Sequence, residues 1–109
     1  MENFTSKDYK EISFRTIPVE VWFFAGVREN PPFGTKYRPH LVVNGTKKYL
    51  GVQFNDLQEA PFGEHISNRV QLTYGSFGVD YSKLILNVNF EIREGARVVG
   101  EGFVSEEVL

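Results

Sequence analysis

Residues 90–104, with the sequence FEIREGARVVGEGFV, read as two β-strands joined by a tight turn. From residue 84 to residue 92 every second residue is apolar, which is the period of a strand with one buried face. Glu94-Gly95 ends this run, because glycine accepts the positive φ that a tight hairpin needs. A second strand is predicted over residues 97–105. The two glycines inside it indicate a bulge, a bend or close approach of another backbone.

The rest of the chain carries the same kind of signal. Pro39 is expected at a strand start, since proline cannot donate within a ladder. Asn44-Gly45 is the strongest short hairpin signal in the chain. No segment keeps a period of 3.6 residues over three turns, so short strands separated by turns favour an all-β barrel or sandwich. The other predicted strands cover residues 19–24, 40–43, 47–54 and 69–74, which makes six in all.

The length of 109 residues fits one domain that can bury a core without covalent staples. The composition is 41% hydrophobic with ten Phe and five Tyr, which favours a folded globule rich in strands. Residues 1–16 are polar and aperiodic, and we expect an arm that frays or adds an edge strand. Residues 17–109 are predicted to form the single β-barrel domain.

Bulk properties argue against several classes of function. A net charge of −2 is not the basic excess of a dedicated nucleic-acid binder. Without cysteine there is no thiolate nucleophile, disulfide or cysteine zinc site. The N-terminus lacks the apolar core of a signal peptide, and no apolar run reaches membrane-spanning length. We therefore expect a cytoplasmic protein with no membrane partner.

Three segments together match a longer pattern. Pro32-Phe33 precedes Tyr37-Arg38-Pro39. Residues 90–104 then fit the pattern F-x-I-R-E-G-x-R-x-V-G-x-G-x-V. In this order the segments resemble the third domain of elongation factor Tu over residues 19–104. That domain is a six-stranded antiparallel Greek-key β-barrel, and the resemblance implies the same fold here. The matching hairpin residues are Phe90, Ile92, Arg93, Glu94, Gly95, Arg97, Val99, Gly100, Gly102 and Val104.

The resemblance also implies a function of docking. In elongation factor Tu this domain packs against the GTP-binding domain, touches the T-arm of aminoacyl-tRNA and contacts the exchange factor. The present sequence has no G-x-x-x-x-G-K-[ST] loop, so we expect no GTP binding. His40 stands where the family has a glutamine near the RNA, and Asn89 where it often has a basic residue. Phosphate contacts need donors or positive charge, and these two positions supply less of either than the family does. Binding of tRNA or elongation factors is therefore the alternative prediction and not the leading one.

No catalytic constellation is recognisable by spacing. His40 and His65 are the only histidines, and neither has the spacing of a metal site around it. No serine lies in a nucleophile elbow, and glutamates in predicted strands are expected on the solvated face. We predict no enzyme activity, no cofactor and no metal. An enzyme or small-molecule site at the barrel mouth stays open as a third alternative.

The leading prediction is a binding module that docks a protein partner, which includes a second copy of the chain. Arg38, Arg93 and Arg97 can be interpreted in two ways. They form a small basic surface for phosphate or carboxylate groups. Alternatively, Arg93 and Arg97 pair with Glu94 around the hairpin, while Arg38 binds backbone carbonyls or a glutamate at the barrel end. The predicted partner-binding residues are Phe33, Lys36, Tyr37, Arg38 and His40, with Arg93 and Arg97 as a second patch.

Overall fold

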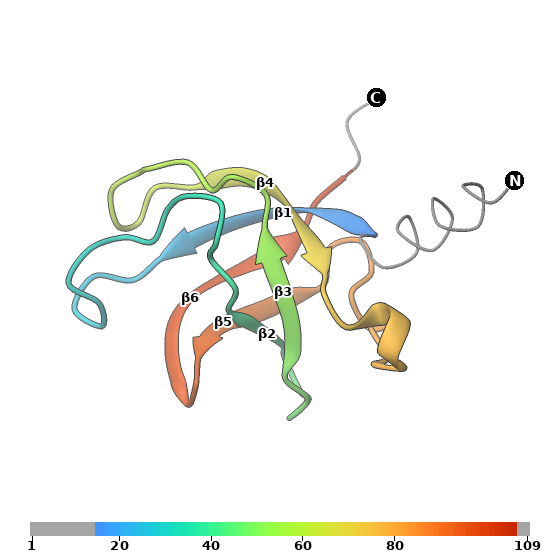
Figure 1. Cartoon of the computed structure of the whole chain (residues 1–109). Coiled ribbons are helices and arrows are strands. Elements are labelled where there is room, and N and C mark those ends of the chain that lie inside the picture. The colour runs from blue at the N-terminus through green and yellow to red at the C-terminus, as the bar shows by residue number, and fades with distance from the viewer. Residues whose placement is uncertain (1–14, 107–109) are drawn as a thin grey trace, which may run out of the picture.

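The computed structural model describes residues 15–106 and has six antiparallel strands that close into a barrel (Figure 1). Around the barrel the strands follow the order β1-β4-β3-β2-β5-β6, and β6 returns to pair with β1. The predicted class, an all-β six-stranded antiparallel barrel, is confirmed. No helix among the described residues is long and apolar enough to span a membrane. The elements are β1 (Thr16–Phe23), β2 (His40–Val43), β3 (Leu50–Phe54), β4 (Ile66–Leu72), a short 3₁₀ helix η1 (Gly75–Phe77), β5 (Asn89–Glu94) and β6 (Arg97–Val104).

The strands alternate as the sequence predicts, with one apolar set inside the barrel. In β1, Val21 and Phe23 lie in the core, while Trp22 between them faces outward and is half-buried. Leu41, Phe54 and other apolar side chains of the neighbouring strands fill the same interior. No charged or polar side chain is buried in the described part of the chain, so hydrophobic burial is the main stabilising term.

The barrel has two ends with different connections. The loop end carries residues 24–39, residues 55–65 and the Gly95-Ala96 turn. The terminal end carries the start of β1, the end of β6, the β2–β3 loop and the β4–β5 connection, residues 73–88 (Figure 1). Two separate surfaces therefore arise, one at each end.

Several strand boundaries differ from the sequence-based prediction. The first strand begins at Thr16, inside the expected arm of residues 1–16, whose residues 1–14 lie outside the described chain. Pro18 lies within β1 rather than before it. Its carbonyl accepts a bond from the Ser105 N–H, one residue beyond the end of β6. The nitrogen of an extended residue points to the same side as its carbonyl oxygen. The N–H that proline lacks would therefore lie beyond the β1–β6 ladder, where no strand bond is lost. The third strand starts at Leu50, because the Asn44-Gly45 turn opens into an unpaired loop.

The predicted strand over residues 84–93 is wrong for its first half. β5 begins only at Asn89, and residues 84–88 form turns. Asn87 has a φ of 71°, which lies in the left-handed region and cannot continue an extended strand. Ile85 and Leu86 consequently point into solvent instead of completing an alternating face. The fourth strand is displaced in a similar way, since it spans Ile66–Leu72 and ends before Thr73.

The glycines of β6 mark close approach of β1, one of the options given by the sequence. Gly100 lies opposite Phe23 and Gly102 opposite Val21. A Cβ atom at Gly100 would lie 2.5 Å from the Trp22 carbonyl oxygen, and one at Gly102 would collide with the Glu20 carbonyl oxygen. A bulge is also present, because the β5–β6 register shifts next to Ile92. β6 thus reaches both of its neighbours only because it lacks side chains at these points.

Replacing Gly100 with alanine should destabilise the barrel by about 1–3 kcal/mol, the usual cost of forcing extra volume into a packed site. Gly75→Ala is the matched control, since a Cβ there meets no atom within 4 Å and its backbone is not left-handed. That control should change stability by less than about 0.5 kcal/mol. Urea unfolding of both variants measures the difference. Equal midpoints would show that close strand approach does not limit closure.

Candidate functional site

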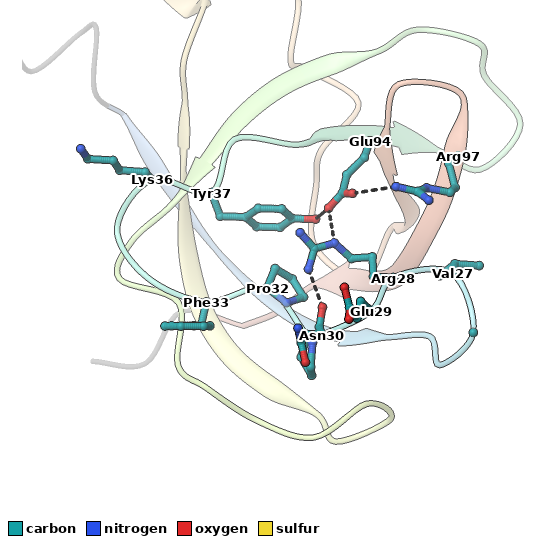
Figure 2. A pocket seen from close by; sticks show the side chains of 12 residues that line it. Val27, Arg28, Glu29, Asn30, Pro32, Phe33, Lys36, Tyr37, Glu94 and Arg97 are labelled. Carbon is teal, nitrogen blue, oxygen red and sulfur yellow. Dashed lines mark hydrogen bonds and ion pairs between the residues drawn. The ribbon is translucent and has the colours of Figure 1, made fainter.

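A hollow of about 860 Å³ opens at the loop end of the barrel. We call it the cradle; its walls are residues 26–37 of the β1–β2 loop and the turn between β5 and β6 (Figure 2). Pro31 and Pro32 are part of the loop wall, and Glu94 and Arg97 form the opposite one. Because proline restricts φ, this loop keeps a defined path over the barrel mouth.

The Glu94 carboxylate ties the two walls together. The Tyr37 hydroxyl donates to its Oε2 at 2.7 Å, and Arg28 Nε lies 2.8 Å from the same oxygen. Arg97 Nη2 lies 3.6 Å from the other oxygen, Oε1. Arg28 also donates from Nη1 to the Asn30 carbonyl at 2.6 Å (Figure 2). One carboxylate therefore fixes the position of both walls through charge-assisted bonds.

Tyr37 belongs to the framework of the site rather than to its outer surface. Its ring packs against Phe23 and Phe54 of the core, with centroids 5.9 Å and 5.6 Å away. The Arg28 guanidinium carbon lies 5.7 Å from the ring centroid. Burial raises the pKa of Tyr37 well above its usual value, and the hydrogen bond to Glu94 raises it further. The hydroxyl therefore remains protonated and acts as a donor.

The exposed part of the cradle combines an aromatic ring with positive charge. Phe33 is 60% exposed, and the Arg97 side chain is 59% exposed. Lys36 is exposed too and projects away from Glu94 (Figure 2). The lining holds three cations, Arg28 among them, against the two carboxylates of Glu29 and Glu94. This arrangement suits a partner with apolar and acidic groups close together.

The structure divides the predicted site residues into two groups. Phe33, Lys36, Tyr37 and Arg97 line the cradle together. Arg97 joins this first group because it lies directly opposite Glu94 across the hairpin, whereas Arg93 lies opposite Val98. The second group consists of Arg38, His40 and Arg93, which do not line the cradle.

Arg93 and His40 meet around Tyr49 on the outside of the barrel. Arg93 Nη1 donates to the Tyr49 hydroxyl at 2.9 Å, and its guanidinium carbon lies 5.5 Å from the ring centroid. The His40 ring makes an edge contact with the same tyrosine at 5.6 Å between centroids. Arg93 also donates to Glu91 at 2.6 Å, and this bond is the main cause that raises the pKa of Arg93. Its charge is thereby largely balanced within the chain.

Arg38 makes a separate hydrogen bond, to Gln53 of β3. Its Nε donates to the side-chain oxygen of Gln53 at 2.9 Å, and Gln53 in turn donates to the Thr35 carbonyl. The sequence-based expectation of a carbonyl or glutamate partner for Arg38 therefore did not identify the acceptor. The bond still leaves the side chain exposed.

Arg28 and Glu94 belong to the cradle network, although neither is among the predicted site residues. The sequence predicts Glu94 as a turn residue and a partner of the hairpin arginines, whereas the structure also pairs it with Tyr37 and Arg28. Arg28 lies in a loop rich in turn formers and has no periodic or motif signal. The one available clue is the pairing of Glu94 with Arg97 across a two-residue turn, which the hairpin register determines.

The Trp22 side chain packs against and hydrogen-bonds to other residues of the chain. It stacks on His65 with ring centroids 4.2 Å apart and planes at 9°. Its Nε1 donates to Glu101 at 3.1 Å, and His65 Nδ1 lies 2.6 Å from Glu20 Oε2. This cluster holds the β3–β4 loop against the outer wall of β1, so Trp22 is not a free stacking platform.

The described residues contain no group of three His, Asp or Glu side chains placed to hold a metal ion. Comparison of the chain with protein-family models and with curated proteins found no match. The cradle and the Tyr49 cluster are therefore judged by their own geometry and charge.

Tyr37 gives this network a pH signature. About one pH unit above the ordinary tyrosine pKa of about 10, Tyr37 of the native protein should still be protonated. Native wild type and native Tyr37→Phe should therefore show the same tyrosinate absorbance at that pH. In urea the same substitution should remove one of five tyrosines from the titration. The pKa of Tyr37 is higher in the folded state than in the unfolded state. The free energy of unfolding is therefore unaffected by its ionisation below about pH 10 and falls as the pH rises further.

Alkaline unfolding of the wild type should accordingly be steeper with pH than that of Tyr37→Phe. Absorbance and urea titrations measure both effects. A native Tyr37 that ionises near pH 10 would contradict the buried bond to Glu94.

Proposed function

We propose that this chain is a non-catalytic binding module that docks a protein partner through the cradle. The observation that carries the proposal is an exposed aromatic, Phe33, and an exposed cation, Arg97, on walls already fixed by Glu94. Aromatic and arginine side chains are the residues most enriched in the cores of protein interfaces. A surface ordered before binding loses less entropy when a partner arrives.

We infer that the module is a relative of the third barrel domain of elongation factor Tu, with the Greek-key path expected of it. The proposal is supported by the closed six-stranded barrel, in which β5 lies beside β2 instead of β4. The two motifs also touch, since Tyr37 of Tyr-Arg-Pro donates to Glu94 of Arg-Glu-Gly. This contact gives a physical reason for the two motifs to occur together.

A protein is the partner favoured by the chemistry of the cradle. Glu94 is engaged with Tyr37, Arg28 and Arg97, and such a closed network suits a scaffold better than acid–base catalysis. The hollow is broad, and its rim offers apolar contact from Phe33 with positive charge from Arg97 and Lys36. A loop or peptide with an aromatic or aliphatic residue next to a carboxylate would match both features.

Affinity purification from the native host tests this surface. We expect the double variant Phe33→Ser, Arg97→Gln to lose a partner that the wild type retains, because both side chains are exposed and their loss leaves the fold intact. Each loss at an interface centre typically costs about 1–2 kcal/mol or more of binding free energy.

The matched control is Phe77→Ser, Lys83→Gln, which also removes an exposed phenylalanine and an exposed cation, but at the terminal end. It should keep the partner. A photo-crosslinking amino acid in place of Phe33 should attach to the same protein. Retention of every bound protein by the cradle variant, or equal loss in both variants, would overturn the assignment of the cradle.

Binding of tRNA or an elongation factor is the second candidate, favoured by the cluster around Tyr49. Its exposed ring contacts both Arg93 and His40, and an aromatic ring beside an arginine can serve as a stacking site for bases. Arg38 lies in the loop two residues before His40, where β2 begins, and could neutralise one phosphate. The pairing of Arg93 with Glu91 reduces this attraction, which places RNA second.

Titration of fluorescent tRNA at several salt concentrations tests this candidate. If RNA binds here, affinity should fall as salt rises, and Arg38→Ala should reduce the salt slope by about one. Lys83→Ala, on the terminal end, should leave the slope unchanged. No salt-dependent binding at micromolar protein would remove the RNA candidate and leave the protein candidate intact.

A further inference from the structure

The β4–β5 connection, residues 73–88, exposes most of the apolar surface outside the barrel core. Seven large apolar side chains are exposed among the described residues, and five of them lie here. Phe77 is 74% exposed and Ile85 63%. A soluble domain rarely leaves such a group of side chains uncovered. We call this set the apolar tip: Tyr74, Phe77, Val79, Ile85 and Leu86.

The apolar tip is held outward by a built anchor. Tyr81 is buried; its hydroxyl donates to the Gly51 carbonyl at 2.6 Å and accepts a bond from the Tyr74 N–H at 3.0 Å. The Tyr74 ring lies where a side chain of residue 51 would be, since a Cβ at Gly51 would approach it to 2.6 Å. Leu84 is buried too and directly precedes Ile85. The exposed side chains are therefore presented from a connection fixed to the barrel wall.

A groove leads from the apolar tip to the point where the described chain begins. A cavity of about 380 Å³ lies between Arg15 and the connection, with Leu72, Val79 and Tyr81 in its lining. The Leu72 N–H donates to the Arg15 carbonyl at 2.8 Å, which fixes the direction of the backbone there. The described chain therefore begins at the lining of this groove, which it shares with Val79 of the apolar tip.

We propose that the N-terminal segment, residues 1–14, is the occupant of the groove and covers the apolar tip of its own chain. The segment contains Phe4, Tyr9, Ile12 and Phe14, four apolar side chains in an otherwise polar stretch. Fully extended, it reaches about 45 Å, far more than it needs to cross the connection. Tethering at Arg15 makes the contact intramolecular, so its effective concentration exceeds that of a free partner.

Charge favours the same occupant. The terminal end carries Arg15, Lys47, Lys48 and Lys83 against Asp80 and Glu106, whereas residues 2–11 contain three acidic residues and two lysines. Asp80 accepts a hydrogen bond from the Ser82 N–H at 2.9 Å, and the hydrogen bonds from Ser82 lower the pKa of this carboxyl. The surface thus keeps a positive excess that a weakly acidic segment complements. This inference is independent of the cradle, which lies at the opposite end of the barrel.

Paramagnetic relaxation measured by NMR on the full chain tests the proposal. The chain has no cysteine, so Ser6→Cys accepts a single nitroxide in the middle of the segment. Amide signals of residues 75–86 should lose most of their intensity, while those of residues 28–33 at the loop end keep theirs. Thr35→Cys with the same nitroxide is the control, and it should leave residues 75–86 unaffected.

Two further samples decide what covers the tip. Phe77→Ser, Ile85→Ser changes only exposed side chains and should restore the signals of residues 75–86 in the Ser6→Cys protein. In a mixture, isotope-labelled chain without nitroxide should keep full intensity beside unlabelled chain that carries it. Intensity loss at residues 75–86 in the mixture would show that a second copy covers the tip and would overturn the proposal. Intact signals in every sample would overturn it as well.

Discussion

The barrel depends on the close approach of its first and last strands. β6 pairs with β5 on one side and with β1 on the other, and Gly100 and Gly102 leave room for the β1 backbone. Closure removes the two sheet edges that an open six-stranded sheet would expose. It also fixes which segments meet at each end, because each strand must start and stop at a set height around the ring.

Both surfaces follow from this closure. At the loop end, the two-residue turn of the hairpin carries Glu94 to the β1–β2 loop, where Tyr37 and Arg28 bind it. At the terminal end, Tyr81 fixes the β4–β5 connection to β3 and leaves Phe77 in solvent. The cradle is organised by ion pairs and a buried hydroxyl, whereas the apolar tip is organised by one buried tyrosine beneath exposed rings. The two ends therefore suit different occupants, and each can be altered while the other stays intact.

Local chemistry explains where sequence reasoning succeeded. A period of two requires neighbouring residues to face opposite ways, and the structure places Val21 and Phe23 inside and Trp22 outside. The hairpin turns at Gly95, as predicted, with a positive φ of 63°. It failed over residues 84–88, where the alternation continues but Asn87 turns the backbone. Periodicity reports which residues are apolar, and it cannot report a left-handed residue that the fold imposes. Ile85 and Leu86 match a strand in sequence and yet form part of an exposed surface.

The sequence by itself determined an all-β chain with six strands, the turn at Gly95 and the special role of the β6 glycines. These features depend on neighbours within a few residues, where backbone preference and side-chain direction are local properties. Only the tertiary structure brought Arg28 and Tyr37 to Glu94, separated Arg93 from Arg97, and gathered exposed apolar side chains beside Arg15. Tyr37 and Glu94 are 57 residues apart in the chain. Contacts at that distance are set by barrel closure and strand register, which no local pattern encodes.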